Sequence, residues 1–333
     1  MYKIAVIGAG TWGIAIANLL ALNGNVVTVY LRSGIEAKKM AKTRKHDKLP
    51  GLVLDEKVDF SNDLYSAIED EDIIIFAVPS YAFREMAHKI VPMTKGNEYL
   101  VTLTKGMEDK TLYTMSEILQ DELKKARKRN NKIVAISGPT HAEEVAKCMP
   151  TFAVSASKDI KAARFIQDVF MGHNFRVYTN TDIKGVEVCA AFKNIIGLAS
   201  GVLVGLGYGD NIRAALLTRG MAEMMRVGKV LSCRKETFYG LAGIGDMIVT
   251  AISISSRNFR CGRLIGEGYD VDKAIEKIGM VVEGVNFIPK AMRIQRKYKL
   301  DLPITRSMYE IVINKKDPRY IFNLLMLRKK KSE

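Results

Sequence analysis

The 333-residue sequence has few of the residues that build disulfide frameworks and metal sites. It holds four cysteines and four histidines, and no two of the cysteines form a Cys-x-x-Cys motif. Disulfide-rich domains and zinc-binding domains both show closely spaced cysteines, which histidines join in the zinc sites. We therefore predict neither a disulfide framework nor a metal site.

The sequence also lacks a long apolar run and a signal peptide. The best candidate for a membrane span, residues 195–208, is interrupted by glycines and is shorter than the roughly 20 residues that a bilayer requires. Only Lys3 precedes the first apolar segment, and no small-residue cleavage site follows it. These absences predict a cytoplasmic protein without a membrane span.

Acidic residues are outnumbered, with 36 Asp and Glu against 51 Lys and Arg and a net charge of +15. Such a charge suits anionic ligands such as phosphates, and it would also suit nucleic acid. The basic runs at residues 124–129 and 328–331, however, lack the interleaved aromatic residues of a single-strand binder. We interpret both runs as solvated surface and predict no nucleic-acid partner.

The most informative motif is Gly8-x-Gly10-x-x-Gly13, which lies between an apolar segment and a helical one. A β-branched segment, residues 26–30, follows the helix, so the pattern is strand, glycines, helix and strand. In a dinucleotide-binding unit Gly8 makes the tight turn, Gly10 admits the pyrophosphate and Gly13 allows close packing, while the helix N-terminus holds the anion. A glycine-rich turn without a ligand is the alternative.

An acidic residue is missing where NAD-binding units usually carry one, at the end of the second strand. Arg32 and Ser33 occupy that place. A guanidinium and a hydroxyl suit the 2′-phosphate of NADP through charge-assisted hydrogen bonds, so we predict that NADPH is favoured. Alternatively, Arg32 stacks on the adenine or is merely solvated, and NAD also binds.

Strand and helix patterns alternate as far as residue 180. Further strands are expected at residues 58–60, 72–78, 98–103, 132–136, 152–155 and 175–178, with a helix at residues 160–170 between the last two. Apolar strands separated by helices predict a doubly wound, mostly parallel sheet that is covered on both faces. Beyond residue 180 only helical patterns remain, including one at residues 271–278, and glycine turns join them, including a loop expected at residues 240–245. The fold class is therefore α/β, with a Rossmann-like dinucleotide-binding domain at 1–180 and an all-helical substrate and catalytic domain at 181–333.

Small and polar residues follow three of the predicted strands. They are Ser80, Lys105 with Gly106, and the segment 137–140. Ligands of open α/β sheets bind outside the carboxyl ends of the strands, so these residues are expected to line a crevice for nicotinamide and substrate. Ordinary turns are the alternative, and Thr140 is expected to cap a helix.

A lysine and an aspartate stand out in the helical part. Lys193 lies inside a strongly apolar helix, where burial disfavours the charged form unless the lysine is paired. It is therefore a candidate proton donor or acceptor, or else a lysine that extends its ammonium to solvent at a helix edge. Asp246 is a candidate partner for Lys193, or else a helix N-cap.

A third candidate is the segment 256–258, Ser-Arg-Asn, which Arg260 and Arg263 follow. The planar guanidinium fork and the hydroxyl suit a phosphate. A solvated basic turn is the alternative.

Eight short motifs together resemble those of the NAD(P)-dependent glycerol-3-phosphate dehydrogenases, in the bacterial form, in order and spacing. They are Gly8-Ala9-Gly10-Thr11-Trp12-Gly13, Thr104-Lys105-Gly106, Ser137-Gly138-Pro139-Thr140, Phe192-Lys193-Asn194, Thr218-Arg219-Gly220, Gly243-Ile244-Gly245-Asp246, Ser256-Arg257-Asn258 and Val281-Val282-Glu283-Gly284. The match spans essentially the whole chain. The alternatives are another two-domain dehydrogenase, acting on a hydroxy acid, and a nicotinamide-sensing regulator without turnover.

The resemblance implies interconversion of sn-glycerol 3-phosphate and dihydroxyacetone phosphate, with the product feeding phospholipid synthesis. It implies Lys193 as proton donor and acceptor, with Lys105 and Asp246 as the other catalytic residues. The implied substrate contacts are Lys105, Gly138, Thr140, Lys193, Asn194, Asp246, Ser256, Arg257, which reaches the phosphate, and Asn258. The cofactor contacts, including those argued above, are Gly8, Gly10, Thr11, Trp12, Gly13, Arg32, Ser33, Lys105, Ala142, Arg257, Val281 and Glu283. The sequence leaves the oligomeric state open, with a homodimer as one expectation.

Overall fold

A computed structural model describes residues 1–128 and 130–330 and divides the chain into two compact units, Met1–Glu187 and Val188–Glu333. The boundary expected after residue 180 falls earlier than this division. The reason lies in helix α8 (Ile183–Gly205), whose first residues belong to the first unit. Glu187 in this part of the helix accepts a hydrogen bond from the Ser116 backbone N–H at 2.8 Å. Of the basic runs named above, Arg129 and Lys331 lie outside the described residues.

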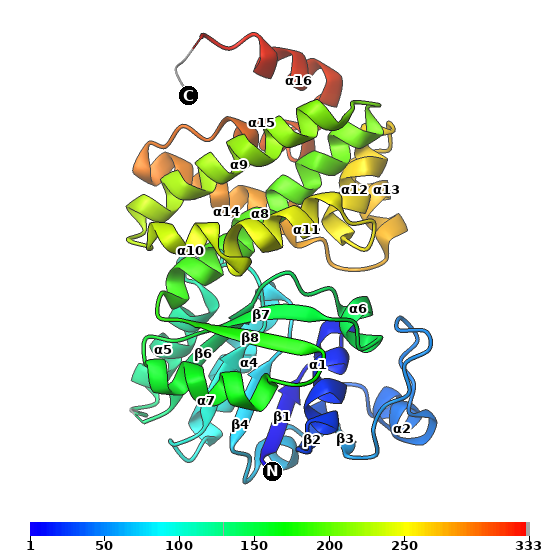
Figure 1. The fold of residues 1–333 in the computed structure, drawn as a ribbon, viewed down its shortest axis with the longest axis vertical. Helices are drawn as coiled ribbons and strands as arrows, with labels where there is room; N and C mark the ends of the chain where they lie inside the picture. The colour runs from blue at the N-terminus through cyan, green and yellow to red at the C-terminus, as the bar shows by residue number, and fades with distance from the viewer. Residues whose placement is uncertain (129, 331–333) are drawn as a thin grey trace. The chain divides into compact units, whose positions relative to one another are not determined.

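An eight-stranded sheet forms the first unit, with the strand order β3-β2-β1-β4-β5-β6-β7-β8 (Figure 1). Its strands are β1 (Lys3–Ile7), β2 (Val26–Tyr30), β3 (Val58–Ser61), β4 (Ile73–Phe76), β5 (Tyr99–Thr102), β6 (Lys132–Ser137), β7 (Thr151–Ala156) and β8 (Phe175–Asn180). All neighbouring pairs are parallel except β6 and β7, which run antiparallel. The predicted doubly wound, mostly parallel sheet is confirmed. Strand order reverses between β1 and β4, which is where such sheets bind ligands.

Helices cover both faces of this sheet. They are α1 (Thr11–Leu22), α2 (Gly34–Thr43), α3 (Leu64–Ile68), η1 (Ser80–Ala82), α4 (Phe83–Met93), α5 (Met115–Lys125), α6 (Ala142–Ala146) and α7 (Ile160–Phe170). Alternate residues of β1 enter two separate apolar clusters: Ile4 and Val6 join one, and Ala5 and Ile7 the other. The first cluster includes residues of α1, α2, α6 and α7, and the second includes residues of α3, α4 and α5. Burial on both faces explains why the strands are apolar throughout.

The described residues of the second unit, 188–330, contain helices and no strand, as the sequence predicts. The helices after α8 are α9 (Asp210–Val230), α10 (Lys235–Tyr239), η2 (Leu241–Gly245), α11 (Asp246–Ile252), α12 (Arg257–Gly266), α13 (Val271–Ile278), α14 (Glu283–Tyr298), α15 (Pro303–Val312) and α16 (Pro318–Met326). Within the segment 240–245, expected as a loop, Leu241–Gly245 instead form a π-helical turn that continues into α11.

Glycines bring α8 and α12 into backbone contact. A Cβ atom on Gly201 would lie 2.0 Å from the Phe259 carbonyl oxygen, and one on Gly262 would lie 2.0 Å from the Leu198 carbonyl oxygen. Neither position therefore accepts a side chain without separating the helices. This crossing fixes the helix that carries Lys193 against the helix that begins with Arg257.

Helix α8 is long and apolar enough to cross a membrane by length and composition alone. An apolar stretch of 18 residues within it is 89% buried inside the protein. Such burial is typical of a core helix, in which apolar residues face protein on every side. The segment 195–208 noted in the sequence is the later part of this helix and the turn that follows it.

Candidate active site

The glycine turn joins β1 to α1 with the geometry that a dinucleotide requires. Gly8 has φ = 117°, and a Cβ there would lie 2.7 Å from the Ala77 carbonyl oxygen. A Cβ on Gly13 would lie 2.1 Å from the Gly8 carbonyl oxygen, so both positions need glycine. Gly10, the N-cap of α1, faces open space, with nothing within 4 Å of its Cβ position, and no side chain caps the helix. Uncapped N–H groups beside open space fit a pyrophosphate.

Trp12 and His46 lie at the same turn. The Trp12 indole N–H is buried and has no hydrogen-bond partner among the described residues. His46 Nδ1 accepts from the Lys48 backbone N–H at 3.2 Å, so its Nε2 carries the proton and donates to the Ala9 carbonyl at 3.2 Å. Burial lowers the pKa of His46, which favours this neutral form. Sequence reasoning missed His46, because no local pattern links it to a turn 37 residues earlier.

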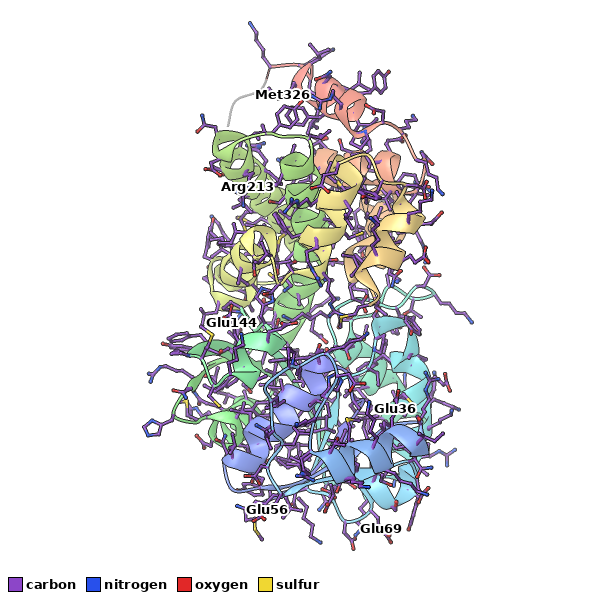
Figure 2. All side chains as sticks on the ribbon, turned by 90° about the vertical axis from the view of Figure 1, so that its right-hand side faces the viewer. Glu36, Glu56, Glu69, Glu144, Arg213 and Met326 are labelled. Carbon is purple, nitrogen blue, oxygen red and sulfur yellow. The ribbon has the colours of Figure 1, made fainter. Side chains whose placement is uncertain are left out.

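Arg32 and Ser33 follow β2 as expected. Arg32 is exposed. Ser33 is the N-cap of α2, and its hydroxyl oxygen accepts from the backbone N–H of Glu36 at 3.2 Å. Glu36 is labelled in Figure 2. The Ser33 oxygen is therefore already used as an acceptor, and its hydroxyl hydrogen remains as the donor. Their predicted contact with a 2′-phosphate stays a prediction.

The ends of β5 and β6 bring Lys105, Gly138 and Thr140 together. Lys105 Nζ donates to the Gly138 carbonyl oxygen at 3.2 Å, and Thr140 Oγ1 donates to the same oxygen at 3.1 Å. Gly138 has φ = 139°, and a Cβ there would lie 3.0 Å from the Phe152 carbonyl oxygen. The expectation that Thr140 caps a helix is wrong, because its hydroxyl turns back to Gly138 and His141 is the N-cap of α6.

Ala142 and Ser80 lie in the turns that follow β6 and β4. Ala142 is the first residue of α6 and is buried. Ser80, also buried, begins the turn η1 that runs directly into α4.

Lys193 is buried inside the second unit and forms an ion pair. Its Nζ bonds to the Asp246 carboxylate and donates to Thr250 Oγ1 at 2.9 Å. Lys193 is 5% exposed and Asp246 is 1% exposed, so the interpretation of Lys193 as a surface-reaching lysine is wrong. The N-cap alternative for Asp246 is also wrong, since Gly245 holds that position and Asp246 begins α11. The pair offsets the cost of burying an ammonium ion.

Thr250 was missed by sequence reasoning. It lies four residues after Asp246 on α11, so both side chains share one helix face. That spacing was the available signal.

An amide network joins the helices beside this pair. Asn258 Nδ2 donates to Asn194 Oδ1 at 2.9 Å, and the Gly284 backbone N–H donates to Asn258 Oδ1 at 2.8 Å. Asn194 Nδ2 donates to the Ala190 carbonyl at 3.1 Å. A Cβ on Gly284 would lie 2.7 Å from the Asn194 carbonyl oxygen, so this position needs glycine. The network links α8, α12 and α14 next to Lys193, Arg257 and Glu283.

The start of α12 is suited to an anion. Ser256 is its N-cap and accepts from the Phe259 backbone N–H at 3.3 Å. Arg257, half-buried, lies in the first turn, where a guanidinium and the helix N-terminus both favour negative charge. Arg260 is exposed and Arg263 pairs with Glu267 at 2.7 Å, which places these two on the solvated helix surface.

Val281 and Glu283 flank Val282, the N-cap of α14, and both are half-buried. Among residues 1–128 and 130–330, no three His, Cys, Asp or Glu side chains are grouped to hold a metal ion. No disulfide joins the four cysteines, which all lie in the described part of the chain.

Comparisons with known proteins cover the whole chain. Residues 3–163 match the family model for the N-terminus of NAD-dependent glycerol-3-phosphate dehydrogenase, and residues 182–323 match the model for its C-terminus. The chain is 48% identical to glycerol-3-phosphate dehydrogenase (NAD(P)+) 2 of Lactobacillus delbrueckii subsp. bulgaricus, over 100% of this chain and 99% of that protein. It is 42% identical to glycerol-3-phosphate dehydrogenase (NAD(P)+) of Bacillus subtilis, over 100% and 96%.

A solved structure agrees with the sequence relatives. The chain resembles the crystal structure of glycerol-3-phosphate dehydrogenase from Coxiella burnetii, with a TM-score of 0.93 and 33% sequence identity. The likeness covers 98% of this chain and 99% of that one.

Proposed function

Because the chain belongs to the NAD-dependent glycerol-3-phosphate dehydrogenase family, we propose that its buried Lys193 is the proton donor and acceptor of the reaction. The protein is an NAD(P)-dependent oxidoreductase that interconverts sn-glycerol 3-phosphate and dihydroxyacetone phosphate. The observation that carries the assignment is the buried contact of Lys193 with Asp246 and Thr250.

Lys193 exchanges a proton with the oxygen atom bonded to the reacting carbon. When bound, the reduced nicotinamide supplies the hydride that this carbon receives. Negative charge then develops on the carbonyl oxygen, and the Lys193 ammonium donates a proton to it, forming the hydroxyl. Asp246 and Thr250 accept from the remaining N–H groups of Lys193 and so hold Nζ in one orientation. In the reverse direction the neutral amine accepts the hydroxyl proton.

Arg257 holds the phosphate of the substrate in this proposal. Its place in the first turn of α12 supports the role, since the helix N-terminus adds to the charge of the guanidinium. Binding energy from the phosphate, which does not react, orients the carbonyl towards Lys193. The amide network keeps α8 and α12 in register for this purpose.

Further parts of the proposal rest on the family and on the sequence. We assign dinucleotide binding to residues 1–180 and substrate binding to 181–333, and the gap between the two family models, 163 to 182, supports that division. NADPH is the favoured cofactor because Arg32 stands where an acid would select NAD. A cytoplasmic location, a homodimer and supply of glycerol 3-phosphate to phospholipid synthesis complete the proposal.

A spectrophotometric assay tests the proposal directly. Purified protein is mixed with dihydroxyacetone phosphate and NADPH or NADH, and loss of reduced nicotinamide is followed. Two alternative substrates are assayed separately for comparison. One is unphosphorylated dihydroxyacetone with the reduced cofactors, and the other is a hydroxy acid with the oxidised cofactors. Faster turnover of the hydroxy acid than of the phosphate ester would contradict the assignment, and absence of any turnover would favour a regulator.

A further inference from the structure

The connection that carries Lys105 is unusually long. Twelve residues, 103–114, separate Thr102 at the end of β5 from Met115 at the start of α5, and we call them the Lys105 loop. Connections in α/β units usually have about 2–6 residues. Inside the loop, Met107 and Thr114 form an antiparallel bridge, and the Glu108 backbone N–H donates to the Tyr113 carbonyl at 2.8 Å. A loop of this length pays a large entropy cost unless other contacts hold it.

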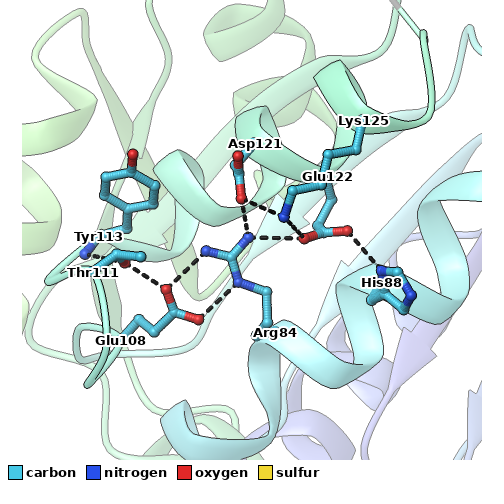
Figure 3. Close-up of polar contacts among 8 residues, drawn as sticks. All are labelled: Arg84, His88, Glu108, Thr111, Tyr113, Asp121, Glu122 and Lys125. Atoms are coloured by element: carbon cyan, nitrogen blue, oxygen red, sulfur yellow. Dashed lines mark hydrogen bonds and ion pairs between the residues drawn. The ribbon is translucent and has the colours of Figure 1, made fainter.

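Arg84 of α4 supplies such a contact (Figure 3). Its Nε donates to Glu108 Oε1 at 2.7 Å and its Nη2 donates to Glu108 Oε2 at 2.8 Å. The two parallel bonds form a bidentate pair, which fixes orientation as well as distance. Thr111, in the same loop, donates to Glu108 from the other side. Glu108 is therefore held by its own loop and by a helix outside it.

Two carboxylates of α5 hold Arg84 in turn. Its Nη1 contacts Asp121 and donates to Glu122 Oε1 at 2.8 Å. Lys125 bonds to the same two carboxylates at 2.8 and 2.9 Å, and His88 contacts Glu122 at 2.9 Å (Figure 3). Burial alone would raise the pKa of Glu122, yet its bonds to Lys125, His88 and Arg84 lower that pKa to about 2. Glu122 is thus ionised at neutral pH.

We propose that Arg84 and Glu108 are positioning residues, which hold the Lys105 loop in the conformation that places the Lys105 ammonium at the Gly138 carbonyl. The proposal rests on the proposed role of Lys105 in contacting substrate and cofactor. Arg84 acts on the loop through Glu108, which lies three residues after Lys105. A bidentate pair suits this task, because a shift of about 1 Å in a binding group can cost about a hundredfold in rate.

The experiment combines substitutions at Arg84 and Glu108 with one at Lys105. Arg84→Met, Arg84→Lys, Glu108→Gln and the double variant Arg84→Met/Glu108→Gln are assayed for KM and kcat with dihydroxyacetone phosphate. Lys89→Met is the matched control, since Lys89 lies on the same helix in an exposed pair with Glu85. Arg84→Met is then repeated in a Lys105→Met protein. Circular dichroism and Trp12 fluorescence confirm folding. If Arg84→Met proves unstable, Glu108→Gln tests the same pair with the Arg84 side chain in place.

We expect Arg84→Met and Glu108→Gln each to lower kcat/KM by about 10- to 100-fold, with Lys89→Met unchanged. The double variant should lose no more than either single variant, because both break one pair. Arg84→Lys should recover part of the loss, since lysine lacks the planar fork. In the Lys105→Met protein, Arg84→Met should cost less than about twofold.

Three results would overturn the proposal, and they do so in two distinguishable ways. Equal losses from Arg84→Met with and without Lys105, or no loss from either Arg84→Met or Glu108→Gln while Lys105→Met is impaired, would refute positioning alone. Full activity of Lys105→Met would refute the proposed role of Lys105 and the positioning proposal with it.

Discussion

Replacing Glu223 with glutamine is expected to remove a pH dependence from the stability of the helical unit. Glu223 lies on α9 and is buried. It accepts from the backbone N–H groups of Ile304 and Thr305 at 2.5 and 3.1 Å, and from the Thr305 hydroxyl at 2.9 Å. Burial raises its pKa to about 7, and these bonds, which favour the ionised form, only partly oppose the effect of burial.

The size of the effect follows from the two protonation equilibria. The folded pKa is about 7 against an ordinary value of 4.5, and at about 1.4 kcal/mol for each pH unit the difference corresponds to about 3 kcal/mol. Since the folded state binds the proton more tightly, this stability is fully present below 4.5 and is lost as pH rises through about 7. Glutamine has no proton to lose, so this pH dependence should be absent from the variant, while the loss of one acceptor oxygen should lower its stability equally at every pH.

Urea unfolding measured at about pH 5 and about pH 8 tests this expectation. Far-UV circular dichroism reports the helices, while fluorescence of the single tryptophan, Trp12, reports the first unit and should be unaffected. Glu236→Gln, at an exposed glutamate of α10, is the control. If wild type and Glu223→Gln lose the same stability between the two pH values, the buried carboxyl is not the source of the dependence.

Three further predictions concern the reaction itself. Lys193→Ala should lower kcat by about 10²- to 10⁴-fold with cofactor affinity retained, because the proton donor is gone; Lys229→Ala, at an exposed lysine of α9, is the control, and near-normal turnover would refute the role. Arg257→Ala should raise KM for dihydroxyacetone phosphate steeply and Arg257→Lys should restore only part, whereas an equal loss with unphosphorylated dihydroxyacetone would contradict a phosphate contact. Wild type should prefer NADPH by about tenfold or more, from the bonds of Arg32 to the 2′-phosphate, and Arg32→Asp should reverse the preference; a wild type that prefers NADH would exclude this reading.

Local patterns predicted much of the fold. The helices at 160–170 and 271–278 match the structure at both ends, because their apolar spacing and their caps, Asp159 and Asp270, all lie within a short stretch of sequence. The antiparallel pairing of β6 with β7 could not be predicted in the same way, since an apolar strand reads identically in either direction. The π-helical turn at 241–245 was predicted as a loop because its two glycines and the Gly240 that precedes it carry no helical signal.

The candidate site was predictable where a residue is costly in its own surroundings. Lys193 in an apolar helix is such a case, and the structure shows the partner that its burial demands. His46 and Arg84 were missed because each is defined by a partner on another element, which one sequence without its fold does not show. Thr250 was missed although its spacing from Asp246 was visible, because its bond to Lys193 on α8 was not.

The glycine crossing of α8 and α12 has a consequence for substrate selection. The proposed proton donor and the proposed phosphate contact lie on two helices whose separation is set by backbone touching backbone. The distance between carbonyl and phosphate that a substrate must have is then determined by glycines, which have no side chain and contact no ligand. Enlarging Gly201 or Gly262 would alter the length of molecule that fits, so homologues with a different substrate are expected to differ first at these crossings.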